Sequence, residues 1–476
     1  MREVEIAIIG TGTAGLTAYR AARKHTDRLA LIEGGPYGTT CARVGCMPSK
    51  LLIAAAEAAE AGRAAPGFGV YAEAPRIDGA EVMGRVRRER DRFVGFVLEA
   101  VASFDQAHIV KGMARFEDSH SLRLDTGETI RAERIVIATG SRPVWPKAFE
   151  SVGDRLSVSD DIFEWADLPG SVAVFGGGII GLELGQALAR LGVRVRILGK
   201  GCGVGPLSDP AVRAAAAAAI GAGVPFEPDA DVQAIVRDGD DVVVRFVDNG
   251  AEREERFDYL LAATGRKPTL DNLDLGKAGL TLNDNGAPDI DPLTMQAGDS
   301  HVFIAGDVAD YIPLLHEVAD DGRIAGDNAA RFPQVLAHRR RAPLGIVFTD
   351  PNLATVGDSF SDLSARPCDF AVGEVDFADQ GRARVLGQNR GLLRVYGERG
   401  TGLFLGAEMV APRAEHLAHL LAWSLQSRLD VLTMLDMPFY HPVIEEGLRT
   451  ALRDLSAKLK LRPESPPRSI DCGPGA

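Results

Sequence analysis

Short apolar runs that end in glycine occur at two places along the chain. The segments IAIIGTGTAG (6–15) and VAVFGGGIIG (172–181) each combine an apolar strand, a G-x-G-x-x-G turn and the start of a helix rich in Ala and Leu. Strands that are apolar at consecutive positions are typical of parallel sheets with helices on both faces. The chain therefore repeats a strand–turn–helix unit, which predicts an α/β fold with two similar halves.

A second repeated pattern closes each half. IVIATGSRP (135–143) and LLAATGRKP (260–268) are apolar strands that end in A-T-G and continue to an arginine and a proline. The first half is longer than the second. We assign the extra length mainly to a helical insertion over 47–102, which contains the Ala-rich run LLIAAAEAAEAGRAA.

The remainder of the chain has a different pattern. HVFIAGDV (301–308) predicts one more strand, which ends at Gly306 and Asp307. From about residue 341, the runs LGIVFTD, LLRVYG and FLGAEMV predict strands and hairpins, and AEHLAHLLAWSL predicts an amphipathic helix. This region therefore reads as a separate α+β domain.

Composition excludes several classes of protein. The chain has 476 residues, 46% of them hydrophobic, which is too long for one core. The net charge of −13 gives no basic face for nucleic acid. Five cysteines do not make a secreted disulfide scaffold, and we find no signal-peptide pattern and no apolar segment of ~18 residues. We expect a protein of the reducing cytoplasm that does not enter a membrane.

The glycine turns have the chemistry of dinucleotide sites. Gly10 permits a tight turn, Gly12 lets the backbone approach a pyrophosphate, and Gly15 lets the helix pack against the strand. The same roles fall to Gly176, Gly178 and Gly181 in the second copy. One such motif is weak evidence, but two copies, each between a strand and a helix, predict two dinucleotide sites.

The two predicted sites differ in the residue that would face the ribose. Glu33 ends the next strand of the first site, where its carboxylate can accept hydrogen bonds from ribose hydroxyls. The matching position of the second site is Gly199, and Lys200 follows it. A carboxylate would repel a 2′-phosphate, whereas a Gly–Lys pair tolerates or attracts one. The second site could therefore take NADP, NAD or both, although Lys200 could equally be an ordinary surface lysine.

The segment TTCARVGCMPSK (39–50) holds two of the five cysteines, Cys41 and Cys46. Metal ligation is disfavoured because no second cysteine pair or histidine lies at zinc-like spacing. Two interpretations stay open, a pair of free thiols or a redox disulfide. A disulfide requires a backbone that is not helical between the cysteines, and Gly45 permits that distortion. Lys50 lies one turn beyond Cys46, where its ammonium could face a flavin.

Two dinucleotide sites in one chain suggest electron transfer between a nicotinamide and a flavin, and Asp307 could bind the ribityl chain of that flavin. The segment TTCARVGCMPSK resembles the redox-active segment of the FAD-dependent pyridine nucleotide–disulfide oxidoreductases. The resemblance extends over nearly the whole chain and includes both glycine turns, both A-T-G strands, 305–307, the phrase FTDPNLATVG and the C-terminal domain. It implies two Rossmann-like domains, for FAD and NAD(P), and a C-terminal α+β dimerisation domain.

With this resemblance, the patterns predict the domain boundaries. We expect an FAD-binding domain at 1–150, an NAD(P)-binding domain at 151–272, a central segment completing the FAD site at 273–342, a dimerisation domain at 343–463 and a disordered tail at 464–476.

The family resemblance implies a role for each catalytic position. Cys46 would lie against the flavin as a thiolate, and Cys41 would exchange with substrate. Lys50 would pair with Glu183. The HPVIEE segment supplies His441 as acid/base, oriented by Glu446, and in the family this histidine comes from the partner subunit. The resemblance therefore implies a homodimer with two shared active sites and no metal.

Further cofactor contacts are expected at the matching positions. For FAD these are Ala114, Thr139, Gly140, Ser141 and Leu315, together with Gly10, Gly12, Gly15, Glu33, Lys50 and Asp307. For NAD(P) they are Val232, Gly265 and Arg266, together with Gly176, Gly178, Gly181, Gly199 and Lys200.

Within the family, three features favour the dihydrolipoyl dehydrogenases. These are the PSK after Cys46, the position of His316, and the pair His441 and Glu446, which mercuric reductases lack. The expected reaction is oxidation of protein-bound dihydrolipoyl groups by NAD⁺ through a Cys41–Cys46 disulfide.

Two departures leave alternatives open. Gly199 is one, and Arg43, where the family usually has Asn, is the other. They allow an NADPH-dependent reductase of a small disulfide, and a flavoprotein that acts mainly as an assembly subunit is a further alternative. The other cysteines, Cys202, Cys368 and Cys472, are expected to be passive.

Overall fold

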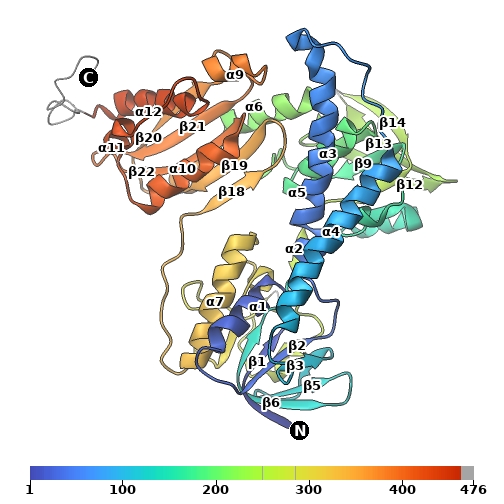
Figure 1. Cartoon of the computed structure of the whole chain (residues 1–476), viewed down its shortest axis with the longest axis vertical. Helices are drawn as coiled ribbons and strands as arrows, with labels where there is room; N and C mark the ends of the chain where they lie inside the picture. The colour runs from blue at the N-terminus through green and yellow to red at the C-terminus, as the bar shows by residue number, and fades with distance from the viewer. Residues whose placement is uncertain (249, 285, 462–476) are drawn as a thin grey trace.

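The computed structural model describes residues 1–248, 250–284 and 286–461. The predicted tail at 464–476, with Cys472, lies outside the described residues. Figure 1 shows one lobe at the bottom of the view, built around β1 and β6, and two units above it. The upper right unit contains β9 and α5, and the upper left unit contains β18–β22.

The lower lobe is built on a sheet in which five parallel strands lie in the order β3-β2-β1-β6-β17. Two further strands, β4 and β5, extend the beginning of β6 as an antiparallel hairpin. Helices α1 (Thr13–Ala22) and α7 (Leu315–Arg331) pack closely against each other beside this sheet (Figure 1). The strands are β1 (Arg2–Ile9), β2 (Leu29–Glu33), β3 (Ile109–Lys111), β4 (Ala114–Phe116), β5 (Ser121–Leu124), β6 (Thr129–Ile137) and β17 (Val302–Ile304).

The predicted insertion is helical. Over 47–102 it contains nearly all of α3 (Cys46–Ala64) and the whole of α4 (Gly79–Ala102), which form a long pair of packed helices, and the short α2 (Thr40–Val44) precedes it. The helix breaks at Gly45, as the sequence predicts, with φ −125° and ψ −117°. A Cβ atom at this residue would lie 3.1 Å from the carbonyl oxygen of Thr40, so a glycine suits the close approach of α2 and α3.

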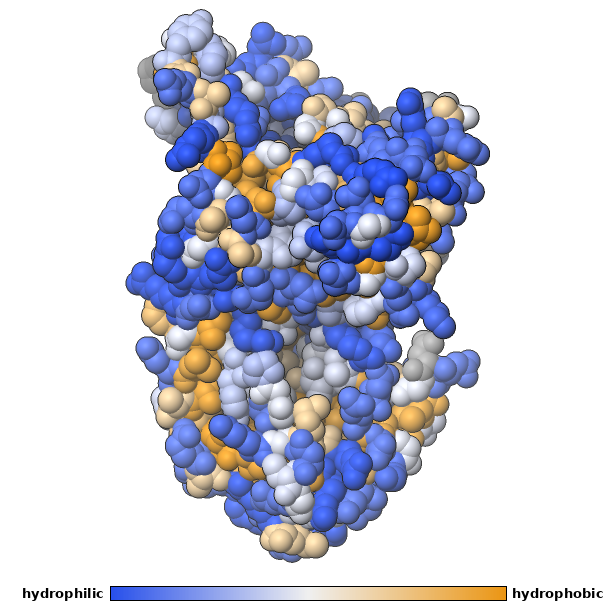
Figure 2. Space-filling model, turned by 90° about the vertical axis from the view of Figure 1, so that its right-hand side faces the viewer, coloured by the Kyte–Doolittle hydropathy of each residue, from blue (hydrophilic) through white to orange (hydrophobic). Residues whose placement is uncertain are grey.

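The second unit repeats the parallel plan in the strand order β11-β10-β9-β15-β8. Helices α5 (Ile179–Arg190) and α6 (Pro210–Gly221) accompany this sheet, and a three-stranded antiparallel sheet of β12, β13 and β14 lies beside it. Figure 2 looks at the side of the molecule that is on the right in Figure 1, and hydrophilic side chains dominate it. The strands are β8 (Leu156–Val158), β9 (Ser171–Phe175), β10 (Arg194–Leu198), β11 (Phe226–Glu227), β12 (Asp231–Asp238), β13 (Asp241–Asp248), β14 (Ala251–Phe257) and β15 (Tyr259–Ala262).

The two A-T-G strands lead into a small sheet that links the two parallel sheets. After Gly140 the chain forms β7 (Ser141–Pro143), and after Gly265 it forms β16 (Arg266–Pro268). These two short strands pair in antiparallel fashion. The repeated motif therefore marks the hinge between the first and second units.

The third unit is an antiparallel sheet in the order β18-β19-β22-β21-β20, packed with helices. Its strands are β18 (Leu344–Val347), β19 (Asn352–Gly357), β20 (Phe370–Asp376), β21 (Leu392–Glu398) and β22 (Phe404–Ala411), and its helices are α8 (Phe360–Ala365), α9 (Gly381–Val385), α10 (Ala414–Gln426), α11 (Val431–Asp436) and α12 (Glu445–Leu459). The predicted fold, two parallel α/β units followed by an α+β unit, is confirmed. In the part of the chain given above, no helix is both long and apolar enough to cross a membrane.

A buried polar cluster joins the second and third units. The Asp209 carboxylate, fully buried at the start of α6, pairs with Arg394 Nη1 at 2.9 Å and accepts from the Tyr396 hydroxyl at 3.1 Å. Glu408 of β22, also fully buried, accepts from the Asp209 backbone N–H at 2.8 Å. Since buried charges need such partners, this cluster holds α6 firmly on the third unit.

Candidate active site

The two cysteines of the predicted redox pair lie at the junction of α2 and α3. Cys41 is half-buried in α2, and Cys46 is the exposed first residue of α3. The Thr39 side chain caps α2 by accepting from the Ala42 backbone N–H at 3.2 Å. The thiols of Cys41 and Cys46 lie next to each other and share a hydrogen bond.

The environment distinguishes the two thiols. The hydrogen bond from Cys41 lowers the pKa of Cys46 to about 7, and the positive charge of Lys50 acts in the same direction. The pKa of Cys41 is raised, mainly because its proton is held in the bond to Cys46 and also because it is partly buried. Cys46 is therefore the thiolate of the reduced pair, and Cys41 keeps its proton.

These pKa values predict the pH dependence of alkylation. In the reduced protein, iodoacetamide should modify Cys46 with a rate that rises through a midpoint near pH 7, about the pKa of this thiol. Because the thiolate is the reacting species, replacing Lys50 by Met should move that midpoint to higher pH. Mass spectrometry of the Cys46 peptide after timed labelling measures both midpoints. Exposed Cys202 provides a reference thiol, and a shared midpoint for the two cysteines would contradict the assignment.

Lys50 and Glu183 meet as the resemblance implies. Lys50 Nζ lies 2.6 Å from Glu183 Oε2, and the Glu183 side chain is only 5% exposed. The other carboxylate oxygen, Oε1, accepts from the Phe348 backbone N–H at 2.9 Å, and Lys50 Nζ lies 4.7 Å from the centre of the Phe348 ring. Residues from all three units therefore fix the ammonium next to the cysteines. The family phrase FTDPNLATVG begins at Phe348, but the sequence alone did not indicate this contact.

His441 and Glu446 form the predicted pair. His441 Nδ1 lies 3.1 Å from each carboxylate oxygen of Glu446. The hydrogen bond from His441 holds the pKa of Glu446 below its usual value. The carboxylate therefore fixes the ring and leaves Nε2 free of this contact, and the histidine side chain is 81% exposed.

The structure does not bring His441 to the cysteines of its own chain. The histidine precedes α12, which in Figure 1 lies on the outer side of the third unit, away from α2 and α3. Beside it is a groove of about 520 Å³ lined by exposed apolar side chains, which include Tyr440, Trp423 and Met437. An exposed apolar surface of this kind marks an interface with another protein. This placement accords with a histidine that serves a second subunit.

The first glycine turn has the geometry of a dinucleotide site. A Cβ atom on Gly10 would lie 2.3 Å from the carbonyl oxygen of Ala138, and one on Gly15 would lie 1.9 Å from that of Gly10. Space is open at Gly12, where no atom lies within 4 Å of an added Cβ. Glu33 is already oriented at this turn, because its Oε2 accepts from both the backbone N–H and the hydroxyl of Thr11 at 2.8 Å. The role of Thr11 is not visible in the motif.

Predicted FAD contacts from distant segments come together at Asp307. The Ser141 hydroxyl donates to Asp307 Oδ2 at 2.7 Å, and Arg266 Nε donates to the Ser141 hydroxyl at 2.9 Å. Arg266 Nη1 also pairs with Asp160 at 2.9 Å. Arg266, which we expected among the NAD(P) contacts, is thus held with Ser141 and Asp307 across the hinge. Thr139 lies next to this group, and its hydroxyl donates to the Thr269 carbonyl at 2.7 Å.

The remaining FAD positions lie around the first sheet. Ala114 is buried in β4, Gly140 joins β6 to β7, and Leu315 is the exposed first residue of α7. The open turn at Gly12, the oriented carboxylate of Glu33 and the cluster at Asp307 together fit the pyrophosphate, ribose and ribityl chain of FAD.

The second glycine turn has the same construction. An added Cβ on Gly176 would lie 2.2 Å from the Ala263 carbonyl oxygen, one on Gly181 would lie 2.0 Å from that of Gly176, and Gly178 is open. Gly265 and Val232 lie beyond this turn, at the end of β15 and in β12. The glycines of this turn fit the pyrophosphate of a pyridine nucleotide. Val232 is placed only by its strand, β12.

The structure supplies a packing reason for Gly199. A Cβ atom there would lie 2.6 Å from the carbonyl oxygen of Pro228, so an acidic side chain does not fit without a shift of the backbone. Lys200 next to it is exposed. A carboxylate does lie nearby, because Asp229 Oδ1 accepts from the Gly201 backbone N–H at 2.7 Å.

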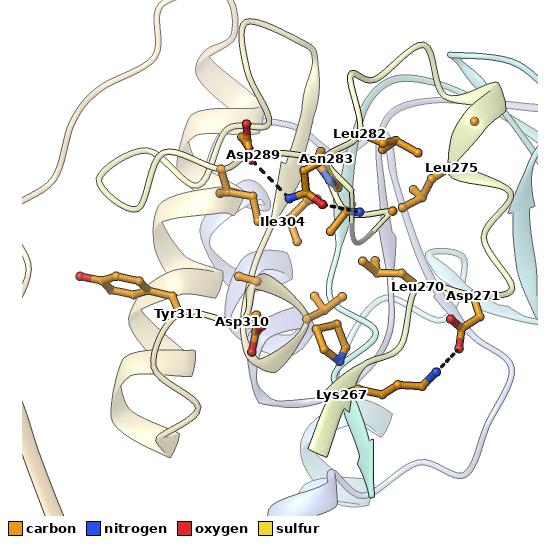
Figure 3. Close-up of a pocket in the computed structure, with 18 of the residues that line it drawn as sticks. Lys267, Leu270, Asp271, Leu275, Leu282, Asn283, Asp289, Ile304, Asp310 and Tyr311 are labelled. Carbon is orange, nitrogen blue, oxygen red and sulfur yellow. Dashed lines mark hydrogen bonds and ion pairs between the residues drawn. The ribbon is translucent and has the colours of Figure 1, made fainter. Parts of the chain in front are cut away.

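A separate cavity of about 840 Å³ lies beside β17 (Figure 3). None of the predicted site residues is among the described residues that line this cavity. Val308, the neighbour of Asp307, is one of the lining residues. Its lysines are already paired, Lys267 with Asp271 at 3.4 Å and Lys277 with Asp274 at 3.0 Å. This cavity is therefore not where the reactive groups gather, and the cysteine pair defines the site. No group of three or more His, Cys, Asp or Glu that could hold a metal occurs in the described part of the chain.

Comparisons with known proteins agree with this geometry. Residues 4–322 match the family model "Pyridine nucleotide-disulphide oxidoreductase", and residues 344–452 match the model of its dimerisation domain. Dihydrolipoyl dehydrogenase of Halobacterium salinarum is 32% identical over 94% of this chain and 95% of its own length. Mercuric reductase of Shigella flexneri is 32% identical over 96% of this chain and 82% of its own length. The structure of the HOCl-induced flavoprotein disulfide reductase RclA from Escherichia coli has a TM-score of 0.79 at 26% identity, covering 95% of this chain and 99% of that one.

The fold and the site define a flavoprotein disulfide oxidoreductase that uses FAD and a pyridine nucleotide. The chain belongs to the pyridine nucleotide–disulfide oxidoreductase family, so the predicted family and its cofactors, FAD and NAD(P), are confirmed. The matched dimerisation domain supports a homodimer. The relatives differ in substrate, and the comparisons therefore establish the class of reaction rather than the molecule that is oxidised or reduced.

Proposed function

We propose that this protein is a dihydrolipoyl dehydrogenase, which oxidises protein-bound dihydrolipoyl groups and reduces NAD⁺. The observation that carries the proposal is the His441–Glu446 pair, with both carboxylate oxygens 3.1 Å from Nδ1. A dithiol substrate must lose a proton before it can attack a disulfide, and an oriented histidine serves as that base. The proposal places the reaction in the cytoplasm, with a lipoyl-bearing protein as partner.

The proposed reaction starts from the oxidised enzyme, with a Cys41–Cys46 disulfide. His441 of the partner subunit takes a proton from one substrate thiol, and the resulting thiolate attacks Cys41 Sγ. The Cys41–Cys46 bond breaks, and Cys46 leaves as a thiolate, which Lys50 stabilises. The second substrate thiol then attacks the substrate sulfur of the mixed disulfide. Cys41 leaves and takes the proton held by the histidine, and the histidine receives the proton of the second thiol, which it later releases to solvent.

This exchange leaves the substrate as a disulfide and the enzyme as a Cys41–Cys46 dithiol. Bound at the first glycine turn, FAD would supply the two-electron chemistry that links this dithiol to the pyridine nucleotide. The residues of this chain bind the two reactants and keep Cys46 ionised. Glu183, fixed by Phe348, keeps Lys50 in place for this purpose.

The test compares two sulfur substrates, each with both coenzymes, on the purified holoenzyme. Dihydrolipoamide with NAD⁺ should be turned over much faster than with NADP⁺, and glutathione disulfide should not be reduced by either coenzyme. Rapid reduction of a small disulfide by NADPH, with slow use of dihydrolipoamide, would overturn the assignment.

One observation favours a second candidate, an NADPH-dependent reductase of a small disulfide. Gly199 offers no carboxylate to repel a 2′-phosphate, and exposed Lys200 could bind one. Replacement of Lys200 by Ala separates the candidates. If Lys200 binds the 2′-phosphate, KM for NADPH rises by about tenfold while KM for NADH does not change. Equal effects on both coenzymes would remove the support for this alternative.

A further inference from the structure

A buried ion cluster lies on the segment that leads into the dimerisation domain. Arg340, in the connection between α7 and β18, is held between two carboxylates of α7. Its Nη2 lies 2.7 Å from Glu317 Oε2 and 2.6 Å from Asp321 Oδ1. The side chains are 13%, 3% and 1% exposed for Arg340, Glu317 and Asp321. The Tyr311 ring covers the guanidinium, with 5.6 Å from its carbon to the ring centre.

The same cluster reaches the turn that carries Asp307. The second oxygen of Asp321, Oδ2, accepts from the Gly306 backbone N–H at 3.3 Å. Gly306 has φ +84°, and an added Cβ would lie 2.9 Å from the Cβ of Ala14 and 3.2 Å from Val318, so the turn is tightly enclosed. One continuous set of contacts therefore joins the connecting segment to the residue expected to hold the ribityl chain.

The charges of the cluster do not balance. Two buried carboxylates share one guanidinium, and burial raises the pKa of Asp321 in spite of Arg340. Arg340 Nε and Nη1 and Glu317 Oε1 are buried without a hydrogen-bond partner. Around the cluster, His316 Nε2 lies 3.7 Å from Glu317 Oε1, and Arg341 pairs with Asp320 at 3.0 Å. A buried ion group that is incompletely satisfied is a poor source of stability, which favours a role in fixing geometry.

The segment between Arg340 and the sheet of the dimerisation domain is short. β18, which pairs with β19 in the sheet of the dimerisation domain, starts at Leu344, so fixing Arg340 restricts where that sheet can lie. We propose that Arg340 and Asp321 are positioning residues that couple FAD binding at the Gly306–Asp307 turn to formation of the homodimer. The inference depends on the family's cofactor and dimer and not on the choice of substrate.

FAD binding and dimerisation must affect each other equally if they are coupled, and this mutual effect can be measured. If FAD and the dimer contact stabilise the same position of the 306–307 turn and the connecting segment, FAD strengthens the dimer by the factor by which dimerisation strengthens FAD binding. In the wild-type protein we expect the dimer dissociation constant to be about tenfold or more lower with FAD than without it. In the Arg340→Met and Asp321→Asn variants this ratio should fall close to one. Arg340→Lys should fall between, because an ammonium keeps the positive charge but lacks the planar group that lies over the Tyr311 ring.

Sedimentation equilibrium of the full chain, with FAD bound and after its removal, measures the ratio, and the fluorescence of released FAD measures cofactor affinity. Arg339→Met is the matched control, since Arg339 is the exposed neighbour on the same segment. The triple variant Glu317→Gln, Asp321→Asn, Arg340→Met removes all three buried charges. It therefore distinguishes the loss of coupling through Arg340 from the effect of a buried charge left without its partner. It should fold but still show a ratio near one.

Three results would overturn the proposal. One is a ratio in Arg340→Met equal to that of the wild type. Another is an equal loss in Arg339→Met. The third is a triple variant that regains the wild-type ratio, because the loss in the single variants would then come only from unpaired buried charge. If a variant loses dihydrolipoamide turnover but keeps the wild-type ratio of dimer dissociation constants, Arg340 does not couple FAD binding to the dimer. The proposed reaction is tested by its own assays.

Discussion

Replacement of Cys41 or Cys46 by Ser should reduce dihydrolipoamide oxidation by at least about 10⁴-fold, because removal of a covalent nucleophile leaves only binding and electrostatic effects. Each variant lacks one sulfur of the disulfide that substrate must attack, and electrons then have no route from the dithiol to FAD. Reduction of ferricyanide by NADH should persist in both variants, since it needs the cofactors but not the cysteines. Steady-state assays of both reactions on the same FAD-loaded preparation measure the difference.

Cys202→Ser is the matched control, because Cys202 is an exposed free cysteine in the second unit and should tolerate the change with full activity. Retention of more than about a tenth of the dihydrolipoamide activity in Cys41→Ser would contradict the disulfide mechanism. Parallel loss of ferricyanide reduction would instead indicate that the variants had lost FAD. The two assays therefore separate the redox pair from the cofactor sites.

The fold was predictable because its signals are local and repeated. The two glycine turns and the two A-T-G strands each combine a strand with the residues that follow it, so a short window shows the whole motif. The helix break at Gly45 was predictable for a related reason, since a disulfide between Cys41 and Cys46 requires it. The contact of Lys50 with Glu183 came from the family resemblance and not from spacing, because these residues lie 133 positions apart.

Several contacts that sequence could not supply depend on backbone groups or on segments far away in the chain. Phe348 fixes Glu183 through its backbone N–H, which leaves no trace in side-chain chemistry. Arg266 follows the second A-T-G motif, but the short strand pair at the hinge takes its side chain to Ser141. Gly199 looked like a choice of coenzyme, and the structure adds a packing cause, the carbonyl of Pro228. A pattern in one segment cannot report which distant backbone will pack against it.

The active site is thus assembled from three units that each contribute a different function. The first supplies the thiols and Lys50, the second supplies Glu183, and the third supplies both Phe348 and the His441–Glu446 pair. Phe348 contacts Glu183 and Lys50 of its own chain, whereas His441 lies before α12, on the outer side of the third unit. In the proposed mechanism the third unit would therefore serve two sites, its own through Phe348 and that of the partner subunit through His441.

This division predicts that two inactive variants can restore each other. Replacement of His441 by Gln should lower dihydrolipoamide oxidation by about 10²–10⁴-fold, the usual contribution of a general acid–base group. In a mixed dimer of Cys41→Ser and His441→Gln subunits, one site carries both changes and the other carries neither. If the subunits pair at random in a closed two-fold dimer, the unselected mixture should recover about a quarter of wild-type activity, and the isolated mixed dimer, with one of its two sites intact, about half. Coexpression with two affinity tags and assay of the doubly selected dimer makes the test direct.

The control for this experiment is a mixture in which both subunits carry the same change. Dimers of Cys41→Ser with a second Cys41→Ser subunit, or of His441→Gln with His441→Gln, should stay inactive under the same tagging and selection. A histidine that acted on its own chain would leave one site without Cys41 and the other without His441, and no mixing ratio could then restore turnover. An inactive mixed dimer with full FAD content would therefore refute the shared site, because the described geometry of His441 and Glu446 would then have to act within one chain.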